Sequence, residues 1–404
     1  MADNDAFLLT GVSVFDGTGS APVPDQAIVV EGRRISWMGP TADAPSFAAE
    51  KTRDGQGGTV IPGMINCHTH VANDGDGDLF AQVQNDTVPI STIRGIKNLA
   101  IALQSGVTTV RDCGAANDLA IDLSKAVDDG MIAGPRIRAA GRVITMTGGH
   151  GHFIGRQADG PVGTAQATRA EIAGGAHFIK VMATGGVLTK GVHPNQTALQ
   201  VDELTAVARE AHNAGRRVAS HAIGGQGIKN ALAAGIDSIE HGFYLDDESL
   251  ETAVSQGTFL VPTLIAVNRI VENGDKIPRW VVEKAESESG HHRDSFLAAV
   301  RSGMKIAAGT DAGTPFNPHG ELPTELELMV EFGLSPAEAL VAATRNAAEN
   351  VDLLHEVGTI EVGKLADLVL LAADPTKDIS ATRQVVMVVK EGTVHRDDQS
   401  TTPQ

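Results

Sequence analysis

The sequence predicts an α/β fold, in which a (β/α)8 barrel (a TIM barrel) carries a small β-sandwich domain. The chain has 404 residues, more than one ordinary core needs. Through its middle, short apolar runs alternate with helical stretches, which is the pattern of parallel strands joined by crossover helices. Strand-and-turn segments without such helices occupy both ends of the chain.

The two ends predict a single β domain. The expected strands are residues 6–14, 27–30, 35–38 and 60–65 near the start, and 366–371 and 385–389 after Gly363. Segments at opposite ends of a chain can form one domain that flanks whatever lies between them. We therefore expect residues 1–60 and 357–404 to form the β-sandwich domain and residues 61–356 to form the barrel.

Eight candidate barrel strands follow one another between these ends, at residues 64–70, 107–112, 137–141, 178–183, 217–221, 238–241, 259–262 and 305–311. A helix is clearest between the fourth and fifth, where Leu204, Val207, Ala208 and Ala211 repeat at helical spacing and Gly215 provides a stop. Eight parallel strands covered on both faces close naturally into a barrel, although strand spacing alone also allows an open doubly wound sheet.

Composition narrows the class of partner. Hydrophobic residues make up 42% and charged residues 20%, as in globular proteins, and the formal net charge is −18. Such a charge argues against nucleic acid or an anionic membrane, because neutralising phosphates requires clustered Lys and Arg. We therefore expect a small-molecule substrate.

Cysteine usage and the lack of hydrophobic targeting segments predict a cytoplasmic protein. Cys67 and Cys113 are the two cysteines, and each lies in an apolar run, which favours reduced core thiols over a disulfide. No stretch reaches the roughly 18 uninterrupted apolar residues of a membrane helix. The first residues show no signal-peptide pattern.

Residues that bind metals recur at the ends of the predicted strands. His68 and His70 lie two apart on a strand, so both imidazoles point to one face and can chelate one cation. His221, His241 and Asp311 end the fifth, sixth and eighth strands. Barrel active sites are built at the carboxyl ends of the strands. Five such residues in register predict a metal site there.

Lys180 lies among apolar residues on the fourth predicted strand. Beside metal ions its ammonium would be repelled, since it offers donors and no lone pair. Its charge therefore has to change if it belongs to the metal site. The alternatives are that Lys180 extends out of the barrel mouth or pairs with Asp311.

Loops at the same end of the barrel supply further candidates. The glycine-rich segment 148–152 can bring His150 or His152 over a substrate carbonyl, and the sequence leaves open which one. Asn73, Gly186 and Val187 follow the first and fourth strands and are expected to line the pocket. A substrate carboxylate would need a local cation, for which the candidates are Arg142, Arg156 and Lys190.

Together these motifs resemble the amidohydrolase superfamily, and specifically its prolidase-like and imidazolonepropionase-related branch. That branch includes Xaa-Pro and Xaa-Arg/Lys dipeptidases and ochratoxin amidases. The resemblance spans nearly the whole chain. The segments that carry it are residues 62–70, Lys180 in Ile-Lys-Val-Met-Ala-Thr-Gly-Gly, His221, His241 in Glu-His-Gly, Asp311 in Ala-Gly-Thr-Asp-Ala-Gly, and the closing residues 357–369.

The resemblance implies a complete binuclear site. Lys180 would be carboxylated by CO2 to an N-carboxylysine that bridges two divalent ions, with zinc as the leading choice. The ligands would divide into His68, His70 and Asp311 on the buried ion and His221 and His241 on the more exposed one. Tyr244 would face the substrate, where related dipeptidases place a phenol. Related enzymes assemble as homo-octamers, so a homo-oligomer is expected.

The expected activity is hydrolysis of the amide bond of N-acyl amino acids or dipeptides, including ochratoxin A-type amides. Two ions roughly 3.5–4 Å apart would share a hydroxide that attacks the carbonyl. Asp311 would then carry a proton to the leaving amine. One alternative is a cyclic amidase or deaminase of the same superfamily, which generally uses one metal and lacks the lysine. Another is a non-catalytic binding protein on the same fold, although such proteins usually lose metal residues.

Overall fold

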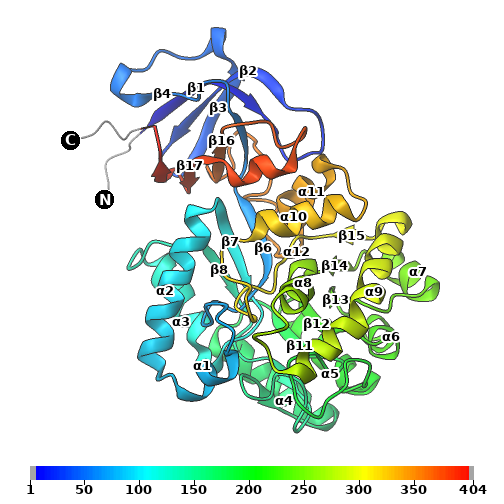
Figure 1. The fold of residues 1–404 in the computed structure, drawn as a ribbon. Helices are drawn as coiled ribbons and strands as arrows, with labels where there is room; N and C mark the ends of the chain where they lie inside the picture. The colour runs from blue at the N-terminus through cyan, green and yellow to red at the C-terminus, as the bar shows by residue number, and fades with distance from the viewer. Residues whose placement is uncertain (1–5, 400–404) are drawn as a thin grey trace.

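Strands from both ends of the chain form one sheet in the computed structural model, which describes residues 6–399 (Figure 1). The strand order is β18-β17-β16-β5-β1-β2-β3, with β4 paired to β1. The C-terminal β16 pairs antiparallel with the N-terminal β5. The strands are β1 Phe7–Val14, β2 Val23–Glu31, β3 Arg34–Pro40, β4 Thr52–Asp54, β5 Thr59–Pro62, β16 Leu368–Leu371, β17 Val385–Lys390 and β18 Thr393–Asp397.

The chain passes from this terminal sheet into the parallel strands at Gly63. The prediction of one strand over residues 60–65 is therefore wrong, because β5 ends at Pro62 and β6 begins at Met64. The Gly63 amide donates to the carbonyl of Asp367 at 2.7 Å, so it still belongs to the terminal sheet. A Cβ atom at Gly63 would lie 2.2 Å from the Thr108 hydroxyl oxygen. The crossing therefore requires a residue without a side chain.

All eight predicted barrel strands are present and their pairs are parallel. A three-stranded sheet has the order β6-β7-β8, and a seven-stranded sheet has the order β10-β9-β11-β12-β13-β14-β15. Their bounds are β6 Met64–Thr69, β7 Val107–Asp112, β8 Arg136–Ala139, β9 Ile144–Thr145, β10 Arg156–Gln157, β11 Ile179–Met182, β12 Val218–Ala222, β13 Ser238–His241, β14 Phe259–Val261 and β15 Lys305–Ile306.

The last of these strands is shorter than predicted. β15 ends at Ile306, whereas the sequence predicts a strand to Asp311. The residues after it nevertheless run beside β6, because the Cys67 amide donates to Ala308 O and the Asp311 amide donates to His68 O, both at 2.8 Å. These bonds bring Asp311 to the carboxyl end of β6.

Helices cover the outside of the parallel strands (Figure 1). The one predicted after the fourth barrel strand is α5, in which Leu204, Val207, Ala208 and Ala211 are buried. The helices are α1 Leu79–Asn85, α2 Val88–Gln104, α3 Leu119–Asp128, α4 Gly160–Gly174, α5 Val201–Asn213, α6 Gly225–Ala233, α7 Asp247–Gln256, α8 Leu264–Glu272, α9 Arg279–Ser302, α10 Leu322–Glu331, α11 Pro336–Ala343 and α12 Arg345–Asn350. Short 3-10 turns lie at Thr41–Asp43, Ala49–Lys51, Ala116–Asp118 and Ile379–Arg383.

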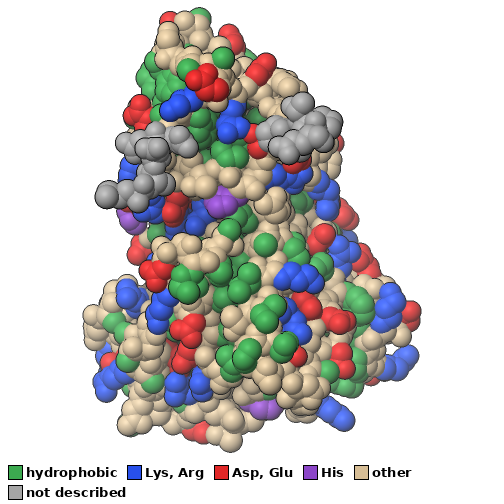
Figure 2. Space-filling view, turned by 90° about the vertical axis from the view of Figure 1, so that its left-hand side faces the viewer, with side chains coloured by type: hydrophobic (Ala, Val, Ile, Leu, Met, Phe, Trp, Pro, Cys, Tyr) green, Lys and Arg blue, Asp and Glu red, His purple; other side chains and the backbone are tan. Residues whose placement is uncertain are grey.

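The face that carries α2 and α3 intersperses acidic, basic and hydrophobic side chains and does not gather basic ones (Figure 2). Val88, Ile90 and Ile93 of α2 are exposed on the surface. Within residues 6–399, no helix combines the length and hydropathy needed to cross a membrane. Cys67 and Cys113 are free and buried, as predicted, and burial raises the pKa of the Cys67 thiol to about 11.

Replacing Gly63 with Ala should lower the free energy of unfolding by about 1–3 kcal/mol, because the new methyl group overlaps buried Thr108. Urea denaturation measures the change. Gly290→Ala in α9 is the matched control, since a Cβ atom there meets nothing within 4 Å. The control should leave stability unchanged or raise it by up to about 1 kcal/mol. Equal stability of the two variants would contradict this account of the crossing.

Candidate metal centre

The six predicted metal ligands meet in one cavity. They line it from β6, β11, β12 and β13 and from the segments that follow β6 and β15. The cavity holds about 810 Å³, counting the space that opens to solvent. The six residues are His68, His70, Lys180, His221, His241 and Asp311. The fold thus brings together side chains that are up to 243 positions apart in the sequence (68 to 311).

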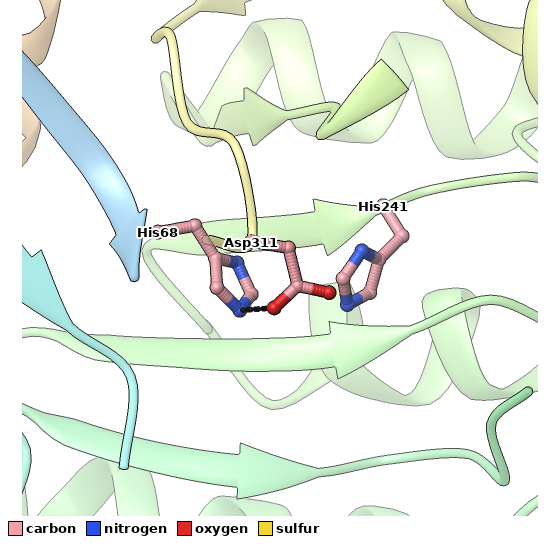
Figure 3. Close-up of side chains that lie close together, drawn as sticks. All are labelled: His68, His241 and Asp311. Atoms are coloured by element: carbon pink, nitrogen blue, oxygen red, sulfur yellow. Dashed lines mark ion pairs between the residues drawn. The ribbon is translucent and has the colours of Figure 1, made fainter. Parts of the chain in front are cut away.

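His68, His241 and Asp311 form the centre of the cluster (Figure 3). One ligand atom from each lies within 4.8 Å of the others. Asp311 Oδ1 is 3.4 Å from His68 Nε2 and 3.2 Å from His70 Nε2. The ring of His221 lies 4.6 Å from that of His241, centroid to centroid. The donor atoms of His68, His241 and Asp311 are therefore close enough to share a cation.

Each of these histidines uses its other ring nitrogen to hold a neighbour. The contacts are His68 Nδ1 with Glu240 Oε2, His70 Nδ1 with Gly114 O, His241 Nδ1 with Thr263 Oγ1 and His221 Nε2 with Gly185 O, all at 2.7–2.8 Å. Such outer contacts fix the tautomer and orientation of a ligating imidazole. His68, His70 and His241 consequently keep Nε2 for a metal, whereas His221 keeps Nδ1.

The protonation states of most of these groups suit a divalent cation, whereas burial at His70 is outweighed by interactions led by the hydrogen bond with Asp311, which raise its pKa. Burial lowers the pKa of His68 to about 4 and lowers the pKa of His221 and His241 well below the usual range. Burial opposes ionisation of Asp311, but its interactions with His68 and His70 outweigh that effect and lower its pKa. Neutral imidazoles and an ionised carboxylate are the donor set that zinc and similar metals prefer.

Lys180 lies deeper in the same cavity. It pairs with Ala219 in the sheet register, two residues before the pair of Met182 and His221. Its side chain is only 1% exposed, which rules out an extended path to solvent. No ion pair joins it to Asp311, and it has no hydrogen-bond partner among residues 6–399. A buried ammonium without a partner is costly, so Lys180 fits a site in which its charge is changed.

Sequence reasoning missed a buried ion pair behind His68. Glu240 is fully buried and accepts hydrogen bonds from Arg111 Nη2 at 2.6 Å, Ser238 Oγ at 2.7 Å and His68 Nδ1. Arg111 also donates through Nε to Cys67 O at 2.5 Å. The available signal was a charged residue of opposite sign on each of two predicted barrel strands. Burial opposes both charges, but their attraction raises the pKa of Arg111 and lowers that of Glu240.

Thr263, which contacts His241, has a strained backbone conformation. A second buried acidic side chain, that of Glu325, supports the chain directly after it. His241, Thr263 and Asp311 have φ values of 71°, 54° and 58°, in the left-handed region. Such outliers persist only where the surrounding structure holds them. Glu325 accepts the first two amides of α8, from Leu264 and Ile265, directly after Thr263. Burial raises the pKa of Glu325 to about 8.

Of the two loop histidines, His150 faces the cavity and His152 does not. His150 lines the cavity, its Nδ1 contacts Thr189 Oγ1 at 2.8 Å, and its ring lies 4.5 Å from that of His221. His152 is exposed and its Nδ1 contacts Gly149 O. The choice that the sequence left open therefore falls on His150.

The remaining predicted residues divide into two groups. Asn73 and Val187 line the cavity. Gly186 packs against His150, since a Cβ atom there would lie 2.5 Å from the imidazole. Tyr244 does not line the cavity, because its ring lies against His291 at 4.5 Å and Phe243 takes the inward position.

The three predicted cations for a substrate carboxylate also lie outside the cavity. Arg142 Nε is 3.6 Å from Asp118, Arg156 Nε is 2.5 Å from Glu171, and Lys190 is exposed.

The fold and the donor set define a class: the chain belongs to the amidohydrolase family, whose model matches residues 59–394. It is a hydrolase acting on amide bonds. The family generally uses divalent metals, in agreement with the clustered ligands. This membership does not support the alternative of a non-catalytic binding protein.

Particular relatives agree with the resemblance seen in the sequence. Ochratoxinase of Aspergillus niger is 30% identical over 395 residues, covering 90% of this chain and 80% of that protein. The crystal structure of a Xaa-Pro dipeptidase with bound methionine in the active site superposes with a TM-score of 0.90 at 32% identity, covering 97% of this chain and 100% of that one. Imidazolonepropionase of Methylobacterium nodulans is 28% identical over 389 residues, covering 87% and 88%.

Replacing Glu240 with Gln should lower the free energy of unfolding by about 3–5 kcal/mol, because Arg111 would keep a buried charge without its partner. Metal affinity should also fall about 10–100-fold as His68 loses its anionic support. Chemical denaturation and competition with a chelator measure the two effects. Glu251→Gln, at an exposed position on α7, is the control and should change neither quantity. Unchanged stability in Glu240→Gln would contradict the role of the pair.

Proposed function

We propose that the protein hydrolyses the amide bond of N-acyl amino acids or dipeptides, including ochratoxin A-type amides, with two divalent ions, zinc first among them. The observation that carries this proposal is Lys180, a buried lysine without a partner inside a cluster of imidazoles and a carboxylate. Carboxylation by CO2 would turn its ammonium into an anionic carbamate with two oxygen donors. The modified Lys180 would then bridge the ions.

The other ligands divide between the two ions by their placement. His68 and His70 both contact Asp311, which supports their assignment to the buried ion. His221 and His241 lie side by side and are assigned to the more exposed ion.

We further propose the closed barrel, the division into residues 1–60 with 357–404 and residues 61–356, and a homo-oligomer. The hydrogen bond from His177 N to Ala139 O and those between β6 and residues 308–312 support barrel closure.

The side chains of the cavity have distinct roles in this reaction. Bound divalent ions lower the pKa of a water molecule and polarise the scissile carbonyl. Asp311 is ionised and 14% exposed to the cavity, so its carboxylate can accept a proton from the attacking water and deliver it to the leaving amine. His150 contacts Thr189 through Nδ1, which leaves Nε2 to donate a hydrogen bond to the carbonyl oxygen.

A mononuclear cyclic amidase or deaminase is the second candidate. His68, His241 and Asp311 would suffice for a single ion, and the similarity to imidazolonepropionase favours this chemistry. Lys180 distinguishes the two candidates, because a mononuclear site gives its buried charge no function.

Metal analysis should find close to two divalent ions per chain after purification with zinc and bicarbonate. Lys180→Ala should retain one or none, because the bridging carbamate is lost. Lys190→Ala, at an exposed position outside the cavity, is the matched control and should keep two. One ion in the wild type and in Lys180→Ala alike would instead favour the mononuclear candidate.

Replacing His150 with Asn should lower kcat by about 10²-fold or more, because the carbonyl loses a donor that acts as the charge develops. His152→Asn provides the comparison, since this side chain is exposed outside the cavity. Steady-state kinetics on one N-acyl amino acid measures kcat for both variants, and metal content measured alongside shows whether either variant has lost metal. Similar losses in both variants would contradict the placement of His150 over the substrate.

A further inference from the structure

One wall of the cavity is apolar and continuous with a hydrophobic cluster. The loops after β11, β12 and β13 and the inner face of α8 supply its side chains, each of which either belongs to the cluster or packs against it. The six are Val187, Leu188, Ile223, Phe243, Val267 and Ile270. A wall of this composition stabilises apolar groups by removing them from water.

The ionisable side chains that line the cavity already have a proposed role in binding metal or in the reaction. Among residues 6–399 they are the six candidate metal ligands and His150. Asp311 is the carboxylate of this set, and His68 and His70 both contact it. A basic substrate group would therefore find no free carboxylate on the cavity wall.

A lysine behind the apolar wall, Lys284, uses its ammonium to bind the protein backbone. Lys284 of α9 donates through Nζ to the carbonyl oxygens of Val192 at 2.6 Å, Thr189 at 2.8 Å and Gly186 at 3.4 Å. Its ammonium also lies 5.0 Å from the ring centre of Trp280. These bonds fix the loop that presents Val187 and Leu188 to the cavity, and they leave no free ammonium for an acidic substrate group.

We infer that the substrate group held by this wall is apolar and uncharged, a branched aliphatic or aromatic side chain or acyl group. A charged group would lose water there without gaining a partner, which is unfavourable. This inference rests on the proposed function and narrows its substrate class: basic and acidic side chains are excluded from the wall.

Two matched series of amides test the inference on the metal-loaded full-length chain. The first keeps an acetyl group and varies the amino acid among phenylalanine, leucine, arginine and aspartate. The second keeps glycine and varies the acyl group among benzoyl, 4-carboxybenzoyl and 4-(aminomethyl)benzoyl. In the series whose varied group meets the wall, kcat/KM should favour neutral members over charged ones by on the order of tenfold or more. Calorimetric binding of the same compounds should rank them in the same order.

The two readouts separate failure of the inference from failure of the proposed function. Preferential binding of neutral compounds without hydrolysis would contradict the proposed function and leave the character of the wall supported. Equal or better binding and turnover of charged members in both series would overturn the inference.

A charge placed on the wall provides a second test. Leu188→Glu, on a partly exposed loop position, should shift the ratio of basic to neutral turnover towards the basic member by about tenfold, in whichever of the two series varies the group that meets the wall. Val271→Glu is the control, since Val271 is 40% exposed on α8 and does not line the cavity. The control should leave the ratio unchanged. Unchanged ratios in both series for folded Leu188→Glu, with its fold checked by thermal unfolding, would show that the wall does not contact the substrate.

Discussion

The buried charge of Lys180 is the constraint on which the rest of the site depends. A lysine that is 1% exposed and has no partner in the described part of the chain cannot remain an isolated ammonium at low cost. Its surroundings include three histidines held neutral by burial, His68, His221 and His241, and one ionised carboxylate, Asp311. Two cations and an added carboxylate at Lys180 would satisfy all of these groups at once.

Rigid support around the ligands is the second feature of the site. Each histidine is fixed through its outer nitrogen, and His68 in particular is held by Glu240, which is itself held by Arg111. The support reaches from β6 through β7 to β13, so that the three strands position one ligand together. Ligands fixed in advance lose little conformational entropy when a metal binds.

The sequence carried enough information to predict the positions of the eight strands and the residues at their ends. Apolar runs mark buried parallel strands, and polar residues that end such runs fall at one end of the barrel. The break at Gly63 and the early end of β15 were not predictable in this way, because both sides of each boundary are equally apolar. These boundaries depend on contacts with Thr108 and with β6, far away in sequence.

The directions of side chains in the loops and in the barrel interior could not be predicted from the sequence either. Only the fold shows that His150 turns inward and His152 outward, or that Phe243 takes the position expected for Tyr244. Arg111 and Glu240 lie 129 positions apart in the sequence, on different strands. The local pattern of residues around either one cannot identify such a distant partner.

A crystal structure of the protein grown with zinc and bicarbonate, phased at the zinc absorption edge, tests the central claim most directly. The account predicts two anomalous peaks, one among His68, His70 and Asp311 and one beside His221 and His241. It also predicts carboxylate density on Nζ of Lys180 between them. A single peak beside an unmodified Lys180 would contradict it.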